Sequence, residues 1–280
     1  MSRKALVVLS GGQDSTTCLA WAKQYFDEVH AITFDYGQRH RIEIDAAIQV
    51  ANILGVESHE IVVVPECLKS VSPLLSDNTL EQYTDYRQMD EVIGDRVELT
   101  FVPLRNPFFF IIAANRAVKL GCESLVTGIC EADNANYPDC RESFKIVFED
   151  MLNVALGNNC YQKEKGWISI EAPLLHLTKA ESVKLAKTLP GCMEALAYSH
   201  TSYDGKYPPT DMNHSNVLRA HGFEEAGEPD PLVVRAWREG RMDLPMTDNY
   251  DGLRDPNEPK YDTVPQDEPK QVDLFGDFNG

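Results

Sequence analysis

The chain has 280 residues, of which 43% are hydrophobic and 25% are charged, so it is long enough to bury a sizeable core. Its formal net charge of −18 argues against tight, direct binding of nucleic acid or an anionic membrane, since both attract Lys and Arg. A small-molecule substrate is therefore expected. The sequence lacks an apolar run of about eighteen residues and a signal-peptide pattern, which predicts a cytoplasmic protein with no membrane span.

The seven cysteines are odd in number and widely scattered, and no two form a C-x-x-C pair. This usage excludes a disulfide framework and a ready-made zinc knuckle. We interpret them as reduced thiols, most of them buried.

Short apolar runs alternate with helical patterns through the first two thirds of the chain. Near-continuous apolar runs at 4–10, 29–35, 59–64 and 123–129 are typical of strands buried on both faces. Helical patterns at 15–24, 42–54 and 107–120 lie between them, the last two followed by Gly55 and Gly121 as C-caps. The alternation predicts an α/β fold with a doubly wound parallel sheet.

The remaining segments interrupt this alternation. Residues 65–100 are predicted to form a long, lid-like loop with one short helix. Further helices are expected at 178–187, around Asn216 and around Pro231. We predict one domain over residues 1–243, with a helical C-terminal part from about residue 174. Residues 244–280, rich in acids and prolines, predict a disordered tail.

A possible phosphate-binding corner follows the first strand, where S-G-G-Q-D-S runs from Ser10 to Ser15. Glycines permit close backbone approach, and the exposed N–H groups at a helix start attract anions. The segment has neither the lysine of a Walker loop nor the third glycine of G-x-G-x-x-G. An ordinary glycine turn with Ser10 as the helix N-cap is the alternative.

S-G-G-x-D-S resembles the pyrophosphate loop of the ATP pyrophosphatases. Together with "TFDYGQRHRIEIDAA", "FVPLRNPFFF" and "TGICEADNANYPDCRESF", it is similar to the 7-cyano-7-deazaguanine synthase family. The resemblance is close from Lys4 to about Gly157 and looser to Gly222. It implies a Rossmann-like PP-loop (adenine nucleotide alpha hydrolase) fold and an ATP- and Mg²⁺-dependent ligase. Such an enzyme converts 7-carboxy-7-deazaguanine and ammonia to an amide and then to the nitrile, each through an adenylate, in queuosine-type biosynthesis.

The resemblance also implies site residues. Those expected to hold the nucleotide are Leu9, Ser10, Gly11, Gly12, Gln13, Asp14, Ser15, Thr16, Thr17 and Arg39. Those expected to act on the reacting groups are Asp14, Ser15, Arg105 and Lys179. Asp14 is also a candidate magnesium ligand through water, whereas Arg41 and Glu43 fit a solvated helix start equally well.

The same comparison implies a set of substrate-binding residues: Asp35, Tyr36, Gln38, His40, Asn106, Glu131, Asp133, Tyr137, Asp139 and Arg141. An acid in the 131–141 loop is expected to accept the N1–H and N2–H donors of a guanine edge. We favour a small buried thiol over a covalent role for Cys140.

Two departures from the family pattern stand out. Family members carry four cysteines that bind structural zinc, but these positions hold Ser202, Thr210, Asn213 and Asn216 here. None is a good zinc ligand, so no zinc is expected, and hydrogen bonds from these side chains are one replacement for it. Leu104 stands where the family usually has glycine, so the approach of the backbone there is expected to differ.

Three functions remain open from the sequence: the nitrile-forming synthase; a divergent ligase that stops at 7-amido-7-deazaguanine or passes the activated base to another acceptor; and a non-catalytic nucleotide-binding scaffold. The chain end "KQVDLFGDFNG" also matches, through Gln271, Leu274 and Phe275, a pattern used for docking to the bacterial sliding clamp. A homodimer is a candidate assembly.

Overall fold

A computed structural model describes residues 2–38, 41–64, 68–76, 79–131, 136–159 and 166–254. Its centre is a five-stranded, all-parallel sheet in the order β3-β2-β1-β4-β5 within these ranges. The strands are β1 (Lys4–Val8), β2 (Glu28–Asp35), β3 (Ser58–Val63), β4 (Ser124–Val126) and β5 (Ser169–Glu171). The predicted doubly wound α/β fold is confirmed.

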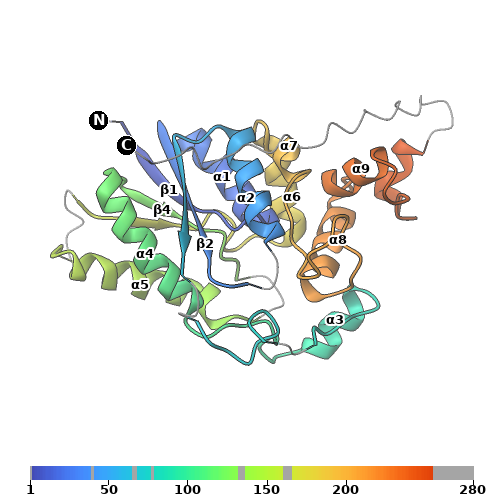
Figure 1. Cartoon of the computed structure of the whole chain (residues 1–280), viewed down its shortest axis with the longest axis horizontal. Coiled ribbons are helices and arrows are strands. Elements are labelled where there is room, and N and C mark those ends of the chain that lie inside the picture. The colour runs from blue at the N-terminus through green and yellow to red at the C-terminus, as the bar shows by residue number, and fades with distance from the viewer. Residues whose placement is uncertain are drawn as a thin grey trace, which may run out of the picture.

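Helices cover both faces of the sheet (Figure 1). The helices around it are α1 (Gln13–Tyr25), α2 (Ile42–Leu54), α4 (Arg105–Leu120), α5 (Glu142–Ala155) and α7 (Cys192–Leu196). Neighbouring side chains of β1 point to opposite faces of the sheet. Val7 packs against α1, α2 and α7 on one face, and Leu6 packs against α4 and α5 on the other. The sheet is thus the middle layer of three.

The three helices predicted between the first strands are confirmed, and α2 begins and ends as expected, with Gly55 in the left-handed conformation. Three elements were not predicted: α5, β5 and α7. The prediction that every strand is buried on both faces is wrong for β3, because it lies at the sheet edge with Ile61 and Val63 exposed.

The C-terminal helices form a separate layer beside the sheet (Figure 1). They are α6 (Lys179–Thr188), α8 (His214–Ala226) and α9 (Pro231–Arg238). Phe223 of α8 is fully buried among α1, α6 and α7 side chains. The one short helix expected in the 65–100 excursion is α3 (Tyr86–Ile93), which packs on α8 through Met89 and Leu218.

The segment predicted to be a disordered tail begins with ordered structure. Residues 248–253 form a 3-10 helix, η2 (Asp248–Leu253), and the buried Tyr250 hydroxyl accepts a hydrogen bond from the Asp230 backbone N–H at 3.3 Å. Residues 255–280 lie outside the described part of the chain. None of the described helices has the length and apolarity needed to cross a membrane.

Candidate active site

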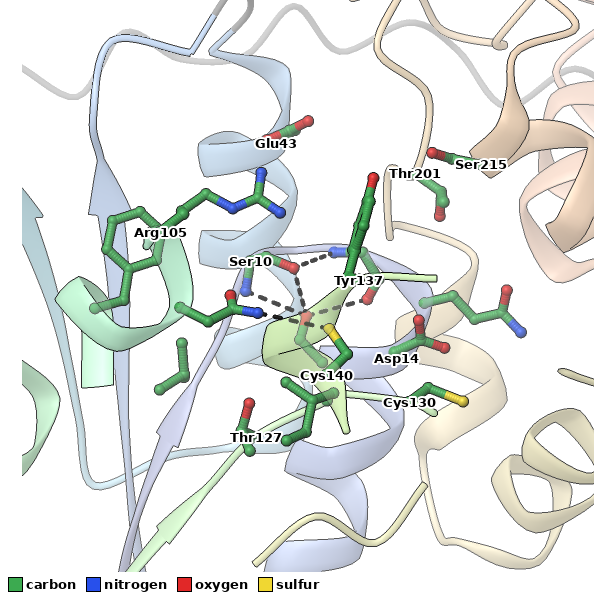
Figure 2. A pocket seen from close by; sticks show the side chains of 18 of the residues that line it. Ser10, Asp14, Glu43, Arg105, Thr127, Cys130, Tyr137, Cys140, Thr201 and Ser215 are labelled. Carbon is green, nitrogen blue, oxygen red and sulfur yellow. Dashed lines mark hydrogen bonds between the residues drawn. The ribbon is translucent and has the colours of Figure 1, made fainter. Parts of the chain in front are cut away.

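A pocket opens at the carboxyl ends of β1 and β4, where the chain order of the sheet reverses and α/β proteins bind their ligands. Figure 2 shows Ser10, Asp14, Arg105, Tyr137 and Ser215 converging on it from elements far apart in sequence. Its cavity of about 290 Å³ has the size of a small-molecule site rather than of a macromolecular surface.

The floor of the pocket is the pyrophosphate loop, defined here as residues 9–17. Ser15 Oγ lies 3.0 Å from Ser10 Oγ and accepts a hydrogen bond from the Ser10 backbone N–H at 3.2 Å. The N-cap of α1 is Gly12, without a side-chain cap, so the alternative that Ser10 is an ordinary N-cap is wrong. Uncapped N–H groups at the start of α1 therefore face the pocket, an arrangement that suits phosphate oxygens.

Gly11 makes this turn possible. Its φ of +86° lies in the left-handed region, and a Cβ there would approach the Glu43 carbonyl oxygen to 2.3 Å. The His200 backbone N–H donates to the Gly11 carbonyl at 2.8 Å. The loop is thus wedged between α2 and the segment after α7, and any side chain at Gly11 would displace it.

An ion pair closes one side of the pocket. Lys179 Nζ lies 3.0 Å from each carboxylate oxygen of Asp14, and the side chains are 8% and 29% exposed. Gly222 of α8 allows this burial, since a Cβ there would lie 2.4 Å from Lys179 Cγ. Lys179 thereby places its side-chain nitrogen beside the pyrophosphate loop.

Arg105 stands at the opposite side, on the first turn of α4. Burial lowers the pKa of its guanidinium, but the nearby Tyr36, Tyr137 and Asp139 more than offset this, so its pKa is raised and the charge is retained. Leu104 precedes it with a φ of +62°, the left-handed conformation that glycine adopts freely. Leu104 therefore occupies a backbone conformation that glycine would adopt at lower cost.

The 136–141 segment forms the wall between β4 and α5. Tyr137 donates its hydroxyl to the buried Glu98 carboxylate at 3.3 Å, which fixes its ring over the pocket. Burial raises the pKa of Asp139, while Arg105 opposes that shift. Cys140 lines the pocket half-buried, with its Sγ 3.6 Å from Asn106 Nδ2, so it is more accessible than the predicted buried thiol.

Glu131 is largely committed to local structure. One carboxylate oxygen accepts the Glu142 backbone N–H at 3.2 Å at the start of α5, and the other lies 3.6 Å from Arg141. This use as a helix N-terminal partner competes with recognition of a guanine edge.

The remaining wall is the C-terminal loop (residues 197–213), which contains Ser202, Thr210 and Asn213, three of the positions that the resemblance aligns with zinc cysteines. Asp211 organises it: its carboxylate accepts hydrogen bonds from Ser202 Oγ at 2.5 Å and from Asn216 Nδ2 at 2.6 Å. The Asn213 side-chain amide also donates to it. Thr210 instead donates its backbone N–H to Asp204 at 2.9 Å. Hydrogen bonds to two aspartates therefore hold the four former cysteine positions.

No group of three or more His, Cys, Asp or Glu side chains is placed to hold a metal ion within the described ranges. The described cysteines are free thiols: Cys18, Cys122, Cys130, Cys140 and Cys192.

The structure brings most predicted residues to one pocket. Those on its wall are Leu9, Ser10, Gly12, Gln13, Asp14, Ser15, Tyr36, Gln38, Arg105, Asn106, Glu131, Tyr137, Arg141 and Lys179. Those beside it rather than on it are Gly11, Thr16, Thr17, Asp35 and Asp139. Thr16 and Thr17 donate their hydroxyls to carbonyls of the preceding helical turn, at 2.8 and 3.0 Å, instead of facing a ligand. Arg39, His40 and Asp133 lie outside the described residues.

Sequence reasoning missed part of the wall. The main additions are Glu43, His200, Thr201, Tyr203, His214 and Ser215. The hydrogen bond from His200 to Gly11 spans most of the chain, and no local pattern signals such a contact. For Glu43 a signal existed in its position shortly after the "YGQRH" motif, on the first turn of the predicted helix.

The parallel sheet, the reversal of strand order at β1 and the S-G-G-Q-D-S loop at the start of α1 define a PP-loop ATP pyrophosphatase, a class that binds ATP. The family model described as "Queuosine biosynthesis protein QueC" matches residues 4–227. The chain belongs to this family.

Curated relatives agree with that assignment. The chain is 47% identical over 232 residues to 7-cyano-7-deazaguanine synthase of Gloeobacter violaceus, an alignment covering 82% of this chain and 95% of the relative. It is 44% identical over 234 residues to the synthase of Laribacter hongkongensis, covering 82% and 94%. It is 42% identical over 240 residues to that of Chromobacterium violaceum, covering 85% and 96%.

Proposed function

We propose that the chain is an ATP-dependent carbon–nitrogen ligase that converts 7-carboxy-7-deazaguanine and ammonia to 7-cyano-7-deazaguanine. Family membership over residues 4–227 supports the activity. The observation that carries the proposal is one pocket in which the pyrophosphate loop, Lys179 and Arg105 face the 136–141 segment. A nucleotide and a planar base can meet there.

The residues fit the chemistry in a defined way. Carboxylate and amide oxygens are poor leaving groups, and transfer of AMP to each makes it a good one. The N–H groups at the start of α1 would bind the departing pyrophosphate, with Lys179 and Arg105 neutralising its charge. Tyr137 and Asn106 line the side where the base would lie.

Magnesium is part of the proposal. Asp14 is the acid of the pyrophosphate loop, and its carboxylate, which Lys179 orients, would hold the ion through water. Mg²⁺ would supply charge neutralisation at the phosphates.

The experiment is to incubate purified protein with ATP, Mg²⁺, ammonium and 7-carboxy-7-deazaguanine and to determine the product masses. The nitrile is expected. Accumulation of the amide alone would favour the divergent ligase, and no conversion at all would favour the scaffold.

Two further proposals concern protein partners: a bacterial sliding clamp and a second copy of this chain. A peptide with Gln271, Leu274 and Phe275, which lie outside the described residues, should bind a bacterial sliding clamp, and a Leu274→Ala, Phe275→Ala peptide should not. Exposed apolar side chains on α5, among them Val147 and Val154, support the homodimer proposal, which light scattering after gel filtration tests. The cytoplasmic location stays a prediction.

A further inference from the structure

Glu43 occupies a place in the pocket that none of the roles above uses. It lies on the first turn of α2, and its side chain lines the pocket on the same side as Arg105 (Figure 2). The close approach of its backbone carbonyl to Gly11 fixes this turn against the pyrophosphate loop. The carboxylate is therefore held beside the place where phosphoryl transfer would occur.

The surroundings of Glu43 leave its carboxylate available. It accepts no hydrogen bond from the part of the chain that the structure describes, and Arg105 is the charged group that acts on it most. The charge of Glu43 also helps to raise the pKa of Tyr36, at the end of β2, and of Tyr203, on the C-terminal loop. The other ionisable groups on neighbouring elements are Asp14 on α1, which pairs with Lys179, and the exposed Arg41, Asp45 and Glu194. His200, on the segment after α7, is buried, and burial lowers its pKa, so its imidazole is neutral near pH 7.

Burial raises the pKa of Glu43 to about 7, and Arg105 acts against that rise. Its carboxyl thus exchanges a proton near neutral pH, the range in which a general base works best. The other acids on the pocket wall already have partners. Asp14 pairs with Lys179, and Glu131 contacts Arg141 and accepts the Glu142 backbone N–H.

The reaction releases protons from nitrogen. When ammonia attacks the adenylated carboxylate, a C–N bond forms, AMP leaves with the electrons of the C–O bond and the nitrogen loses one proton. When the amide oxygen then takes AMP from ATP and leaves with it, the nitrogen loses two protons as C=N and then C≡N form. The first adenylation releases none, because the carboxylate is already ionised.

We propose that Glu43 is a catalytic residue that accepts these protons from the substrate nitrogen and passes each to solvent before the next. This inference rests on the proposed ligase function and assigns a role within it. It predicts that the steps differ: carboxylate adenylation needs no proton acceptor, whereas conversion of the amide to the nitrile does.

The test is Glu43→Gln, with Asp45→Asn on the exposed side of the same helix turn as the matched control. Two rates are measured: pyrophosphate formation from 7-carboxy-7-deazaguanine without ammonia, and nitrile formation from 7-amido-7-deazaguanine. Glu43→Gln should retain the first within about threefold and lose about 100-fold in the second, the usual contribution of a general base. Asp45→Asn should change neither.

The pH profile gives a second readout. Nitrile formation by the wild type should rise through about pH 7 to a plateau, since the base must be ionised. Glu43→Gln should lose this rise, and Glu43→Asp should keep it at a reduced rate. Equal loss of both rates, or an unchanged pH profile in Glu43→Gln, would overturn the role of Glu43. Absence of pyrophosphate formation by the wild type would instead refute the ligase function.

Discussion

The pyrophosphate loop and the C-terminal loop form the floor and an adjoining wall of one pocket, but different contacts hold each of them. In the pyrophosphate loop, Ser10 and Ser15 bond each other five positions apart. In the C-terminal loop, Asp211 accepts hydrogen bonds from Ser202, which precedes it in sequence, and from Asn216, which follows it. Local contacts of the turn shape the first of these, whereas the half-buried carboxylates of Asp204 and Asp211 shape the second.

This difference separates chemistry from stability. The pyrophosphate loop leaves its N–H groups open to a ligand, so its polar residues should contribute mainly to turnover. In the C-terminal loop, Asp211 accepts hydrogen bonds from Ser202 and Asn213, and Arg219 donates to Ser199, Thr201 and Asp230 beneath the loop. Changes there should act first on folding.

The largest expected effect is on stability, from Asp230→Ala. Asp230 and Arg219 form a bidentate pair at 2.6 and 2.8 Å, with side chains only 4% and 5% exposed. Removing the acid leaves a buried guanidinium uncompensated, so the free energy of unfolding should fall by about 4 kcal/mol. Denaturant unfolding measures it.

Glu239→Ala at the C-cap of α9 is the control, because its pairs with Arg235 and Arg241 are more exposed and together should contribute at most about 1 kcal/mol. Equal effects of the two substitutions would break the comparison between the walls.

Asp14→Asn should have the largest effect on turnover. The change removes the charge next to the pyrophosphate loop but keeps the size of the side chain, so turnover should fall about 100-fold. Since Lys179 is buried while Asp14 is 29% exposed, loss of their ion pair should lower the free energy of unfolding by about 2 kcal/mol, less than Asp230→Ala does. Steady-state kinetics and thermal unfolding of one preparation compare the two. Near-normal turnover would remove Asp14 from the site.

Asp211→Ala sharpens the comparison from the other wall. Ser202 and Asn213 are each 1% exposed, and without Asp211 they lose an acceptor, so the free energy of unfolding should fall by about 2 kcal/mol. Since hydrogen bonds to Asp204 and Asp211 hold this loop, a chelator should leave the melting temperature of the wild type unchanged. Stoichiometric zinc in purified protein contradicts this account of the loop.

Leu104→Gly should have the smallest effect. A left-handed leucine carries about 1 kcal/mol of strain, and the greater freedom of glycine in the unfolded chain cancels part of the gain. A net stabilisation of about 0.5 kcal/mol is expected, whereas Leu104→Ala keeps the strain and should give none. Thermal unfolding of the two variants distinguishes them, and identical melting temperatures would argue against strain at this position.

The sequence predicted the pyrophosphate loop because its information is local. An apolar strand, two glycines and a helix start lie within Leu6–Leu19, and the same order appears in the structure. The C-terminal loop was not predictable in this way, since neither Asp211 nor the Arg219–Asp230 pair belongs to any local period. Hydrogen bonds there were foreseen as an alternative to zinc, but their acceptor was not.

The missed elements have comparable reasons. β5 has three residues, too few to show a period, and its burial depends on pairing with β4. β3 has an apolar sequence, yet its place at the sheet edge exposes it. Glu43 fitted a solvated helix face as well as a site, because only the packing of α2 on Gly11 decides which way that turn faces.

The stoichiometry of nitrile formation tests the central claim most directly. Starting from 7-carboxy-7-deazaguanine, ATP, Mg²⁺ and ammonium, pyrophosphate and AMP are counted against nitrile. If one pocket activates first the carboxylate and then the amide, each nitrile requires two pyrophosphates and two AMP. One pyrophosphate per product, with the amide as that product, would contradict the claim.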